Sequence, residues 1–547
     1  MGIRLPVIGM ISPIRIFVLT GLWIVCVITV DLIVSHTLHA QYAASTGRGS
    51  VYSPYPSGLI PGDLEKETNR VLKEIATMES EAMTEWQALP KNSGTAMRQV
   101  QLLGKIELFD KNLSVNRNMA CSSCHMPYTG FSGPISSVNA TTVAYPGSVQ
   151  YRFGKRKPQG YTYSPNYPVL QYNRTQQDFY GGNFWDLRAT GFRTQSPDAE
   201  QAQDPPHDSQ EMGLPDAACV VYRIAMGAYA DVFTAVWGPQ AFQINWPSNA
   251  DEACNKPQGA FGPNQTPLKL SAIDRGKANA AYDQYALAIT AYESSPDISP
   301  FSSKFDQALA NADKKILSAD ELAGWALFRG KAKCNTCHLD GTENTFQQPS
   351  SGSSTTGVGN AAGVAPLFTD FTSSNLGLPR NPDNPFYYQD VPDSYGFTPN
   401  PQGKKFVDLG VGLFLRGRSG TPPDPNWAQY APQFDGKMQV STLRNVDMRP
   451  SPTFVKAYMH NGYLKSLKEV VHFYNTRDVY KAGPGGCTAA TEKKTCWPAP
   501  EVTANVDTTV GNLGLTDHEE DLIVLFMQTL TDGVTHPYPG ANAYTGN

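Results

Sequence analysis

The sequence predicts an all-α fold in which two similar domains with long loops follow an N-terminal apolar segment. Three observations favour this class: two Cys-x-x-Cys-His motifs, a short pattern repeated ahead of each motif, and segments with apolar residues at helical spacing. We divide the 547 residues into four parts. They are a signal peptide or membrane anchor at 1–40, a helical extension at 41–100, and two domains at 101–310 and 311–547.

The apolar segment near the N-terminus, residues 16–34, is long enough to cross a bilayer and follows Arg4 and Arg15. Residues 38–40, Leu-His-Ala, have the pattern of a cleavage site, but the apolar run is longer than a usual signal-peptide core. A cleaved signal peptide and an inner-membrane anchor are both open. In either case we expect the body of the protein in the periplasm, with membrane contact only through residues 16–34.

The extension at 41–100 contains one expected helix, Leu64–Trp86. Its apolar stripe is thin, and no residue in it suggests chemistry. The stripe consists of Leu64, Val71, Ile75 and Met78.

The two Cys-x-x-Cys-His motifs have the spacing of c-type haem attachment. In such a site both thiols bind one haem covalently and the histidine binds its iron, which leaves the sixth position of each iron to be assigned. A redox dithiol or a shared zinc site is disfavoured, because 213 residues separate Cys121 from Cys334 and each motif has its own histidine. The predicted haem-binding residues are Cys121, Cys124, His125, Cys334, Cys337 and His338.

A glycine followed by a Leu-Phe pair precedes each motif, which indicates two related domains. An apolar helix is expected near the end of each domain, at 285–292 and 522–530. Short helices around a haem indicate two cytochrome c-like domains. The repeated pattern consists of Gly104 with Leu108–Phe109 and Gly324 with Leu327–Phe328.

Capping boxes at Ser318–Glu321 and Thr516–Glu519 mark the starts of two helices in the second domain. Between residues 341 and 440 lies a stretch rich in Gly, Ser, Asn and Pro, which is too long for an idle connection in a compact domain. We expect a loop insertion there, either on the surface or as a partner-binding region.

Four further cysteines suit an oxidising compartment. Local pairing of Cys219 with Cys254 and of Cys487 with Cys496 is the simplest arrangement, although four cysteines allow three connectivities. The formal net charge of −5 provides no basic field for nucleic acid, so no nucleic-acid partner is expected.

The stretch Leu103–Phe131 resembles the first haem segment of the bacterial di-haem cytochrome c peroxidase family, especially its MauG-type branch. Thr442–Asn445 and Ala457–Asn475 resemble the C-terminal signature of that family. The likeness covers residues 100–540 in pieces and implies two c-type haems with unequal roles. In the family, the residue at the Tyr474 position is the sixth ligand of the second haem.

The residues around Tyr474 agree with that assignment. Ser466–Glu469 forms a capping box, and Leu467, Val470, Val471 and Tyr474 follow at the spacing of one helix face. His472 points about 200° away from Tyr474 around the helix. Met459 is the other rival ligand, and a core tyrosine packed beside the haem is the structural alternative.

The first haem is expected to stay open, because no histidine follows His125 before His207. The resemblance implies that Gln201, Pro205 and Glu211 line the peroxide pocket, with Glu211 as the acid/base, and that Trp185 lies between the haems. The alternatives are a surface carboxylate for Glu211 and core packing for Trp185. His207 is either a solvated loop histidine or a reversible ligand of the first haem.

Two departures limit the resemblance. Ala332 stands where MauG has the surface tryptophan that oxidises its protein substrate, so that route is absent. The calcium ligands of the family cannot be mapped, because residues 447–456 are lengthened and Asn173 is only a loose match. One calcium ion is compatible with the sequence but has no assigned ligands.

These observations together predict a periplasmic di-haem oxidoreductase that reduces hydrogen peroxide at the first haem and relays electrons through the second. Its further partner would be a small electron-donor protein or a protein that it oxidises. The alternative is a non-catalytic electron-transfer cytochrome in which both irons are six-coordinate. Oxygen-dependent cleavage of an organic substrate is a third class that no residue demands.

Overall fold

The computed structural model describes residues 61–89, 96–261, 266–311, 314–341 and 365–535. The predicted apolar segment at 16–34 lies outside these ranges. Within them, no single helix has the length and apolar character of a membrane span. Taken together, α6 (Ala218–Ala225) and α7 (Ala230–Trp237) have the required length and apolar composition, but the pair is bent by 109°.

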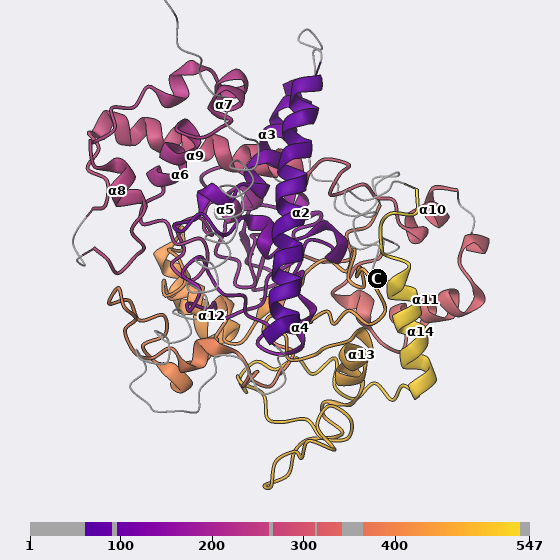
Figure 1. Cartoon of the computed structure of the whole chain (residues 1–547). Helices are drawn as coiled ribbons and strands as arrows, with labels where there is room; N and C mark the ends of the chain where they lie inside the picture. The colour runs from indigo at the N-terminus through magenta and orange to yellow at the C-terminus, as the bar shows by residue number, and fades with distance from the viewer. Residues whose placement is uncertain (1–60, 90–95, 262–265, 312–313, 342–364, 536–547) are drawn as a thin grey trace, which may run out of the picture. The chain divides into compact units, whose positions relative to one another are not determined.

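The predicted helix of the extension is α2, Pro61–Ala88, the long indigo helix in Figure 1. Val71, Ile75 and Met78 lie on its buried side, at most 6% exposed, as the thin apolar stripe predicts. This side packs on α3, Ala96–Phe109, which leads into the first Cys-x-x-Cys-His motif.

Helix α3 crosses α9, Ala272–Glu293, and the crossing requires Gly104. A Cβ atom on Gly104 would lie 1.9 Å from the backbone oxygen of Ala288, far inside van der Waals contact. The same arrangement recurs in the second region, where a Cβ on Gly324 would lie 1.9 Å from the backbone oxygen of Leu522. The repeated glycines therefore mark two equivalent helix crossings.

The second crossing joins α11, Ala319–Arg329, to α14, Asp517–Gln528. Both begin with the predicted capping boxes: Ser318 and Thr516 accept hydrogen bonds from the N–H three residues later, and the Glu side chains accept from the cap N–H. Helix α13, Leu467–Thr476, packs on α14 (Figure 1).

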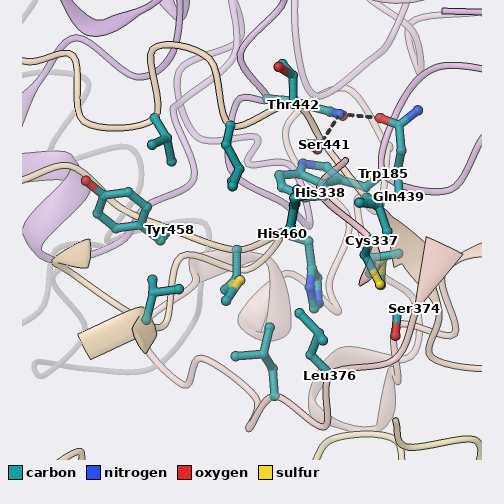
Figure 2. Close-up of a pocket in the computed structure, with 18 of the residues that line it drawn as sticks. Trp185, Cys337, His338, Ser374, Leu376, Gln439, Ser441, Thr442, Tyr458 and His460 are labelled. Carbon is teal, nitrogen blue, oxygen red and sulfur yellow. Dashed lines mark hydrogen bonds between the residues drawn. The ribbon is translucent and has the colours of Figure 1, made fainter. Parts of the chain in front are cut away.

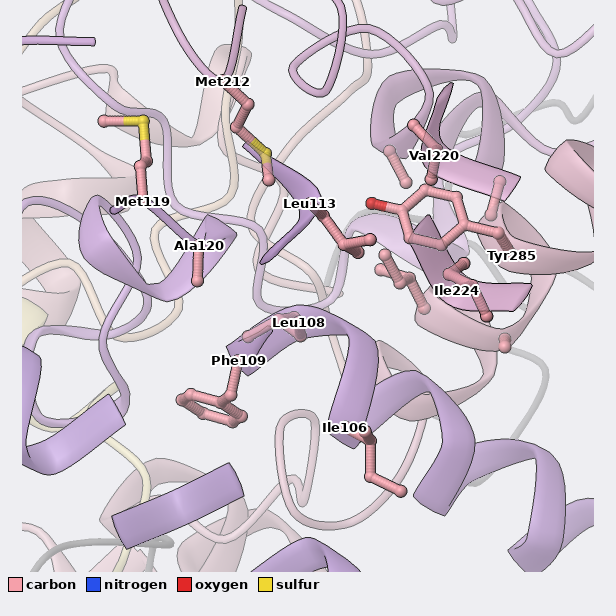
Figure 3. Packing of buried hydrophobic residues seen from close by; sticks show 14 of the residues in the cluster. Ile106, Leu108, Phe109, Leu113, Met119, Ala120, Met212, Val220, Ile224 and Tyr285 are labelled. Atoms are coloured by element: carbon pink, nitrogen blue, oxygen red, sulfur yellow. The ribbon is translucent and has the colours of Figure 1, made fainter. Parts of the chain in front are cut away.

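Two hydrophobic clusters surround the crossings. The larger one gathers the buried residues of α2, α3 and α9, and Figure 3 shows Leu108, Phe109 and Tyr285 within it. The smaller one is built around α11, α13 and α14 and contains Phe328 and Phe526, both 0% exposed. Each cluster adjoins one Cys-x-x-Cys-His motif, since Cys121 packs against the first and Cys334 against the second.

The remaining helices are short, and the described strands form two small antiparallel sheets. The all-α expectation is thus corrected to a helix-rich fold with few strands. Strand β1 pairs with β2, and β3 with β4. Their bounds are β1 Gln171–Asn173, β2 Asp178–Tyr180, β3 Ser373–Ser374, β4 Met438–Gln439, α4 Ser136–Ala140, α5 Pro197–Ala202, α8 Ala250–Cys254, α10 Lys304–Ala310 and α12 Val411–Leu415.

The expectation of a surface insertion at 341–440 needs correction for residues 365–440, the part that the structure describes. Phe368, Phe371 and Phe414 are at most 1% exposed, and β3 and β4 lie within this stretch. The stretch is loop-rich, as its Gly and Pro content predicts, but aromatic side chains bury it in the body of the protein.

Both local disulfides form. Cys219 pairs with Cys254 and Cys487 with Cys496, with Cα atoms 5.4 and 5.6 Å apart. The four cysteines of the two motifs stay unpaired. The simplest of the three connectivities is therefore confirmed.

Candidate haem sites

Each Cys-x-x-Cys-His motif lines its own large cavity. We call the cavity lined by Cys121, Cys124 and His125 the first cavity, and the one lined by the motif Cys334–His338 the second cavity. Their volumes are about 190 and 220 Å³, respectively.

The two histidines are held by the same unusual backbone feature. His125 Nδ1 lies 2.8 Å from the carbonyl oxygen of Phe131, and His338 Nδ1 lies 2.9 Å from that of Phe368. Both phenylalanines have positive φ, 54° and 53°, which turns their carbonyls toward the rings. A donating Nδ1–H makes Nε2 the ring nitrogen that could bind iron in each motif. The His125 ring also hydrogen-bonds to the backbone of Gln159.

Sequence reasoning missed these carbonyls, because no side-chain type marks them. Phe131 follows His125 by six residues, whereas Phe368 follows His338 by thirty, across the Gly- and Ser-rich stretch. These two carbonyls can be identified only when the backbone conformation is known.

The motif cysteines are protonated thiols in this environment. Desolvation raises the pKa of Cys121, Cys334 and Cys337 to about 12. Among the described residues, no group of three or more His, Cys, Asp or Glu lies together as a zinc site would require.

Other residues on the cavity walls also fit a haem. The Nζ of Lys456, a side chain only 7% exposed, donates to the backbone oxygens of Asn445 and Met448, 2.9 and 3.0 Å away. Lys157 Nζ likewise donates only to a backbone oxygen. Neither ammonium has a carboxylate partner in the described part of the chain, and the carboxylates of a bound haem would supply one. Desolvation lowers the pKa of Lys456 to about 7 and that of Lys157 to about 8.

The two cavities share a wall. Trp185 lines both, together with Lys157, Gln159 and Gly160. Lys157 Nζ lies 5.6 Å from the centre of the Trp185 ring, and the ring of His460 packs edge-on against that ring at 6.3 Å. Figure 2 shows Trp185, His460 and His338 on the side of the second cavity. Trp185 therefore belongs to the wall that the two cavities share.

Gln201, Pro205 and Glu211 come together in the first cavity, as expected. Ser196 caps α5, which carries Gln201 near its end. Desolvation raises the pKa of Glu211 to about 8, with a further increase from the negative charges of Asp208 and Asp204. A carboxyl group with such a pKa can exchange protons near neutral pH.

Two methionines, Met119 and Met212, also line the first cavity. His207 does not line it: its backbone oxygen accepts from Gln258, and its ring lies 6.4 Å from that of Tyr282. The structure thus supplies sulfur ligands as rivals for the sixth position of the first iron, while His207 lies outside the cavity.

Tyr474 lines the second cavity together with Leu467 and Val470, so one face of α13 is turned toward it as predicted. Met459 lines the same cavity and remains the rival ligand. His472 points elsewhere: its Nδ1 lies 3.0 Å from Glu520 Oε1 and its Nε2 2.7 Å from the carbonyl oxygen of Lys494.

The predicted capping box of α13 is only half formed. Ser466 accepts from Glu469 N–H as expected, but the Glu469 carboxylate accepts from the N–H of Lys465 instead of Ser466. The start of the helix was nevertheless predicted correctly, because the Ser466 cap alone defines it.

The two departures have structural counterparts. Ala332 is 1% exposed, so even its position is closed to a partner protein. Asn173 sits at the end of β1 and accepts from the N–H groups of Thr175 and Gln176 in a local turn. In the lengthened stretch 447–456, the carbonyl of Met448 already accepts from the Lys456 ammonium group, as does that of Asn445 just before the stretch. Calcium therefore stays a prediction without assigned ligands.

Residues 98–314 match the family model described as di-haem cytochrome c peroxidase. The chain is 25% identical over 464 residues to the methylamine utilization protein MauG of Paracoccus denitrificans, covering 84% of this chain and 94% of that protein. It is 24% identical over 444 residues to the cytochrome-c peroxidase IdrP1 of Denitromonas iodatirespirans, covering 80% and 83%.

Solved structures show the same fold. The diheme peroxidase BthA of Burkholderia thailandensis matches with a TM-score of 0.53 at 23% identity, over 80% of this chain and 86% of that one. A variant of BthA matches with a TM-score of 0.56, over 81% and 88%. The resemblance seen in the sequence is confirmed: the chain is a di-haem peroxidase-type oxidoreductase that is similar to MauG and to cytochrome-c peroxidases of the di-haem family.

Proposed function

We propose that this protein reduces hydrogen peroxide in the first cavity, with electrons relayed from a second haem through Trp185. One observation carries the proposal. Glu211, Gln201 and Pro205 line the first cavity and not the second, whereas Trp185 lines both. The chain therefore puts acid/base groups beside one predicted haem and connects that site to the other.

A haem held by Cys121, Cys124 and His125 would supply an iron that binds peroxide and exchanges electrons. The reaction consumes two electrons and two protons for each peroxide and yields two water molecules. Ionised Glu211 accepts the proton of the near oxygen and returns it to the far oxygen, which leaves as water. Gln201 can orient the peroxide by hydrogen bonds, and the Pro205 ring restricts the water around it.

In the second cavity we propose that Tyr474 is the sixth iron ligand. Desolvation and the nearby motif cysteines raise the pKa of its phenol, so a metal cation is needed to displace the proton. A phenolate stabilises ferric and higher states, which suits a site that stores oxidising equivalents.

The electron source is a small electron-donor protein or a protein that the enzyme oxidises, and Ala332 makes the surface-tryptophan route of MauG inapplicable. We place the protein in the periplasm, and its two disulfides support an oxidising compartment. Residues 16–34 would be its only contact with the membrane.

Peroxide consumption by the haem-loaded protein, reduced with an artificial donor, tests the proposal. The wild type should consume peroxide and Glu211→Gln should lose most of this activity, while Glu252→Gln on the surface should keep it. If the wild type binds no peroxide and a Met212 variant opens the first iron, the electron-transfer alternative is correct, because the iron was closed by sulfur.

A further inference from the structure

Two buried carboxyl groups, Asp198 and Glu293, adjoin the first cavity and have no part in the chemistry above. Asp198 lies in the first turn of α5, and Glu293 is the last residue of α9. Their exposed fractions are 0% and 3%, and Glu293 lines the first cavity. Burial of two acidic side chains needs an explanation, because an isolated buried carboxylate is strongly unfavourable.

The two carboxyl groups lie close enough for a hydrogen bond between them when one is protonated. Ser164 Oγ donates to Asp198 Oδ1 at 2.5 Å, and Asn183 Nδ2 lies 3.4 Å from the same oxygen. The hydroxyl of Thr290 also adjoins Asp198, and that of Ser164 adjoins Glu293. In the described chain, Asp198 Oδ2 and Glu293 Oε2 have no hydrogen-bond partner with a fixed proton. No basic side chain in that part of the chain is ion-paired with either residue, so no cation balances two negative charges.

An ionised carboxylate is only a hydrogen-bond acceptor, so two of them can bond only if one carries a proton. Two like charges at this separation also oppose each other's ionisation, as in other carboxyl dyads. We propose that Asp198 and Glu293 share one proton and form a proton store that releases this proton into the first cavity during peroxide reduction.

The proton balance of peroxide reduction shows what the Asp198–Glu293 pair would contribute. Glu211 returns to the far oxygen the proton that it takes from the near one, so it adds no net proton. The store supplies one of the two protons that the reaction consumes: an O–H bond of the pair breaks, and the proton ends in product water. The doubly ionised pair then regains a proton from solvent water, while the electrons come from the donor. This inference rests on the proposed function in one respect: peroxide reduction is the reaction that uses the released proton.

The pKa values support this arrangement. Desolvation raises the pKa of Glu293 well above its ordinary value, and the charge of Asp198 raises it further. The pKa of Asp198 is raised as well, again by desolvation, and its hydrogen bonds only reduce this increase. Both pKa values are thus raised, as a pair that keeps one proton requires.

Infrared spectra of the haem-loaded protein test the shared proton without any turnover. The wild type should show the C=O band of a protonated carboxyl that moves to lower frequency in D₂O. Asp198→Asn and Glu293→Gln should each remove or displace this band, because both groups belong to one hydrogen-bonded unit. A band that is absent from the wild type, or unchanged in either variant, would overturn the shared proton.

Glu107→Gln is the matched control, since Glu107 is another carboxyl with 0% exposure but neither Asp198 nor Glu293 is among the groups that act on it. It should leave the band in place. The isotope shift is measured on the wild type, so that part of the test does not depend on the folding of any variant.

Time-resolved spectra after mixing the reduced protein with peroxide test the release. The band should lose intensity and recover in the wild type, and stay constant in Glu211→Gln. If the wild type consumes peroxide while the band stays constant, the proton store is wrong. If the wild type consumes no peroxide but the static band behaves as described, the proposed function fails and the shared proton stands.

Discussion

In both haem regions, two helices cross at a glycine, a Cys-x-x-Cys-His motif adjoins the crossing, and the histidine Nδ1 bonds to the carbonyl of a phenylalanine with positive φ. The other residues that line the two cavities differ. The first presents Glu211, Gln201 and Pro205, whereas the second presents Tyr474 and Met459.

The comparison teaches that the two regions share one backbone frame and differ in the side chains that would decide the chemistry of each site. A carboxyl group with a raised pKa suits proton transfer to a bound substrate, and a phenol suits permanent ligation. Trp185 and Lys157 line both cavities, so the two cavities are adjacent.

The largest expected effect tests the common frame. Gly104→Ala and Gly324→Ala should each destabilise the protein by about 3 kcal/mol or more, because the new methyl group meets a backbone carbonyl that cannot move independently of its helix. The control is Gly276→Ala in α9, the helix that Gly104 packs against. Nothing lies within 4 Å of a Cβ at Gly276, so this change should be neutral or stabilising by up to about 1 kcal/mol. Thermal melts compare the three; equal melting temperatures would mean that the crossings are looser than described.

The next largest effect should be confined to the first cavity. Glu211→Gln should slow the reaction with peroxide by roughly 10²–10⁴-fold, because it removes the group that transfers the proton. The spectrum of the second haem should not change. Stopped-flow mixing with peroxide measures the rate, and a rate within about twofold of the wild type would remove Glu211 from the mechanism.

The mirror experiment is Tyr474→Phe. Only the low-spin signal of the second haem should change, because the phenol oxygen is lost while its ring packing is kept. Met459→Leu is the matched control and should leave that signal as it is. If the Met459 variant alters the signal and the Tyr474 variant does not, the ligand assignment must be exchanged.

The pH dependence of the peroxide reaction sharpens the role of Glu211. Desolvation raises the pKa of this carboxyl, so its ionised form is the minor species at neutral pH and grows as the pH rises toward about 8. The rate should therefore increase with pH by about tenfold per unit below that value and then level off. Glu211→Gln should be independent of pH over this range; a wild-type rate that falls with rising pH contradicts the carboxylate as the base.

The smallest effect concerns the shared wall. Trp185→Phe should leave the initial reaction with peroxide unchanged but slow the exchange of electrons between the two haems several-fold, because a less easily oxidised ring replaces the indole. Rapid-mixing spectra that follow each haem separately measure both steps. Unchanged exchange would mean that electrons pass by another route.

Much of the frame could be predicted from local sequence, because helix caps, haem motifs and short-range disulfides are set by neighbouring residues. The Ser318 and Thr516 caps, the Cys219–Cys254 bridge and the orientation of His472 agree with the predictions. The repeated glycines also pointed to related regions, although the close helix contact that requires them could be seen only in three dimensions.

The features that were missed depend on contacts between distant segments. Phe368 binds His338 through a backbone carbonyl, and Asp198 meets Glu293 across 95 positions of sequence. Residues 365–440 are rich in Gly and Pro, which suggested surface loops, but their aromatic side chains are buried. Composition describes the local conformation of such a stretch and does not reveal where it packs.

The most direct test of the account is the electron paramagnetic resonance spectrum of the diferric protein before and after one equivalent of peroxide. The account predicts one high-spin and one low-spin haem at the start, since the first site is open and Tyr474 closes the second, followed by loss of both signals on reaction. Two low-spin signals that do not respond to peroxide would contradict it.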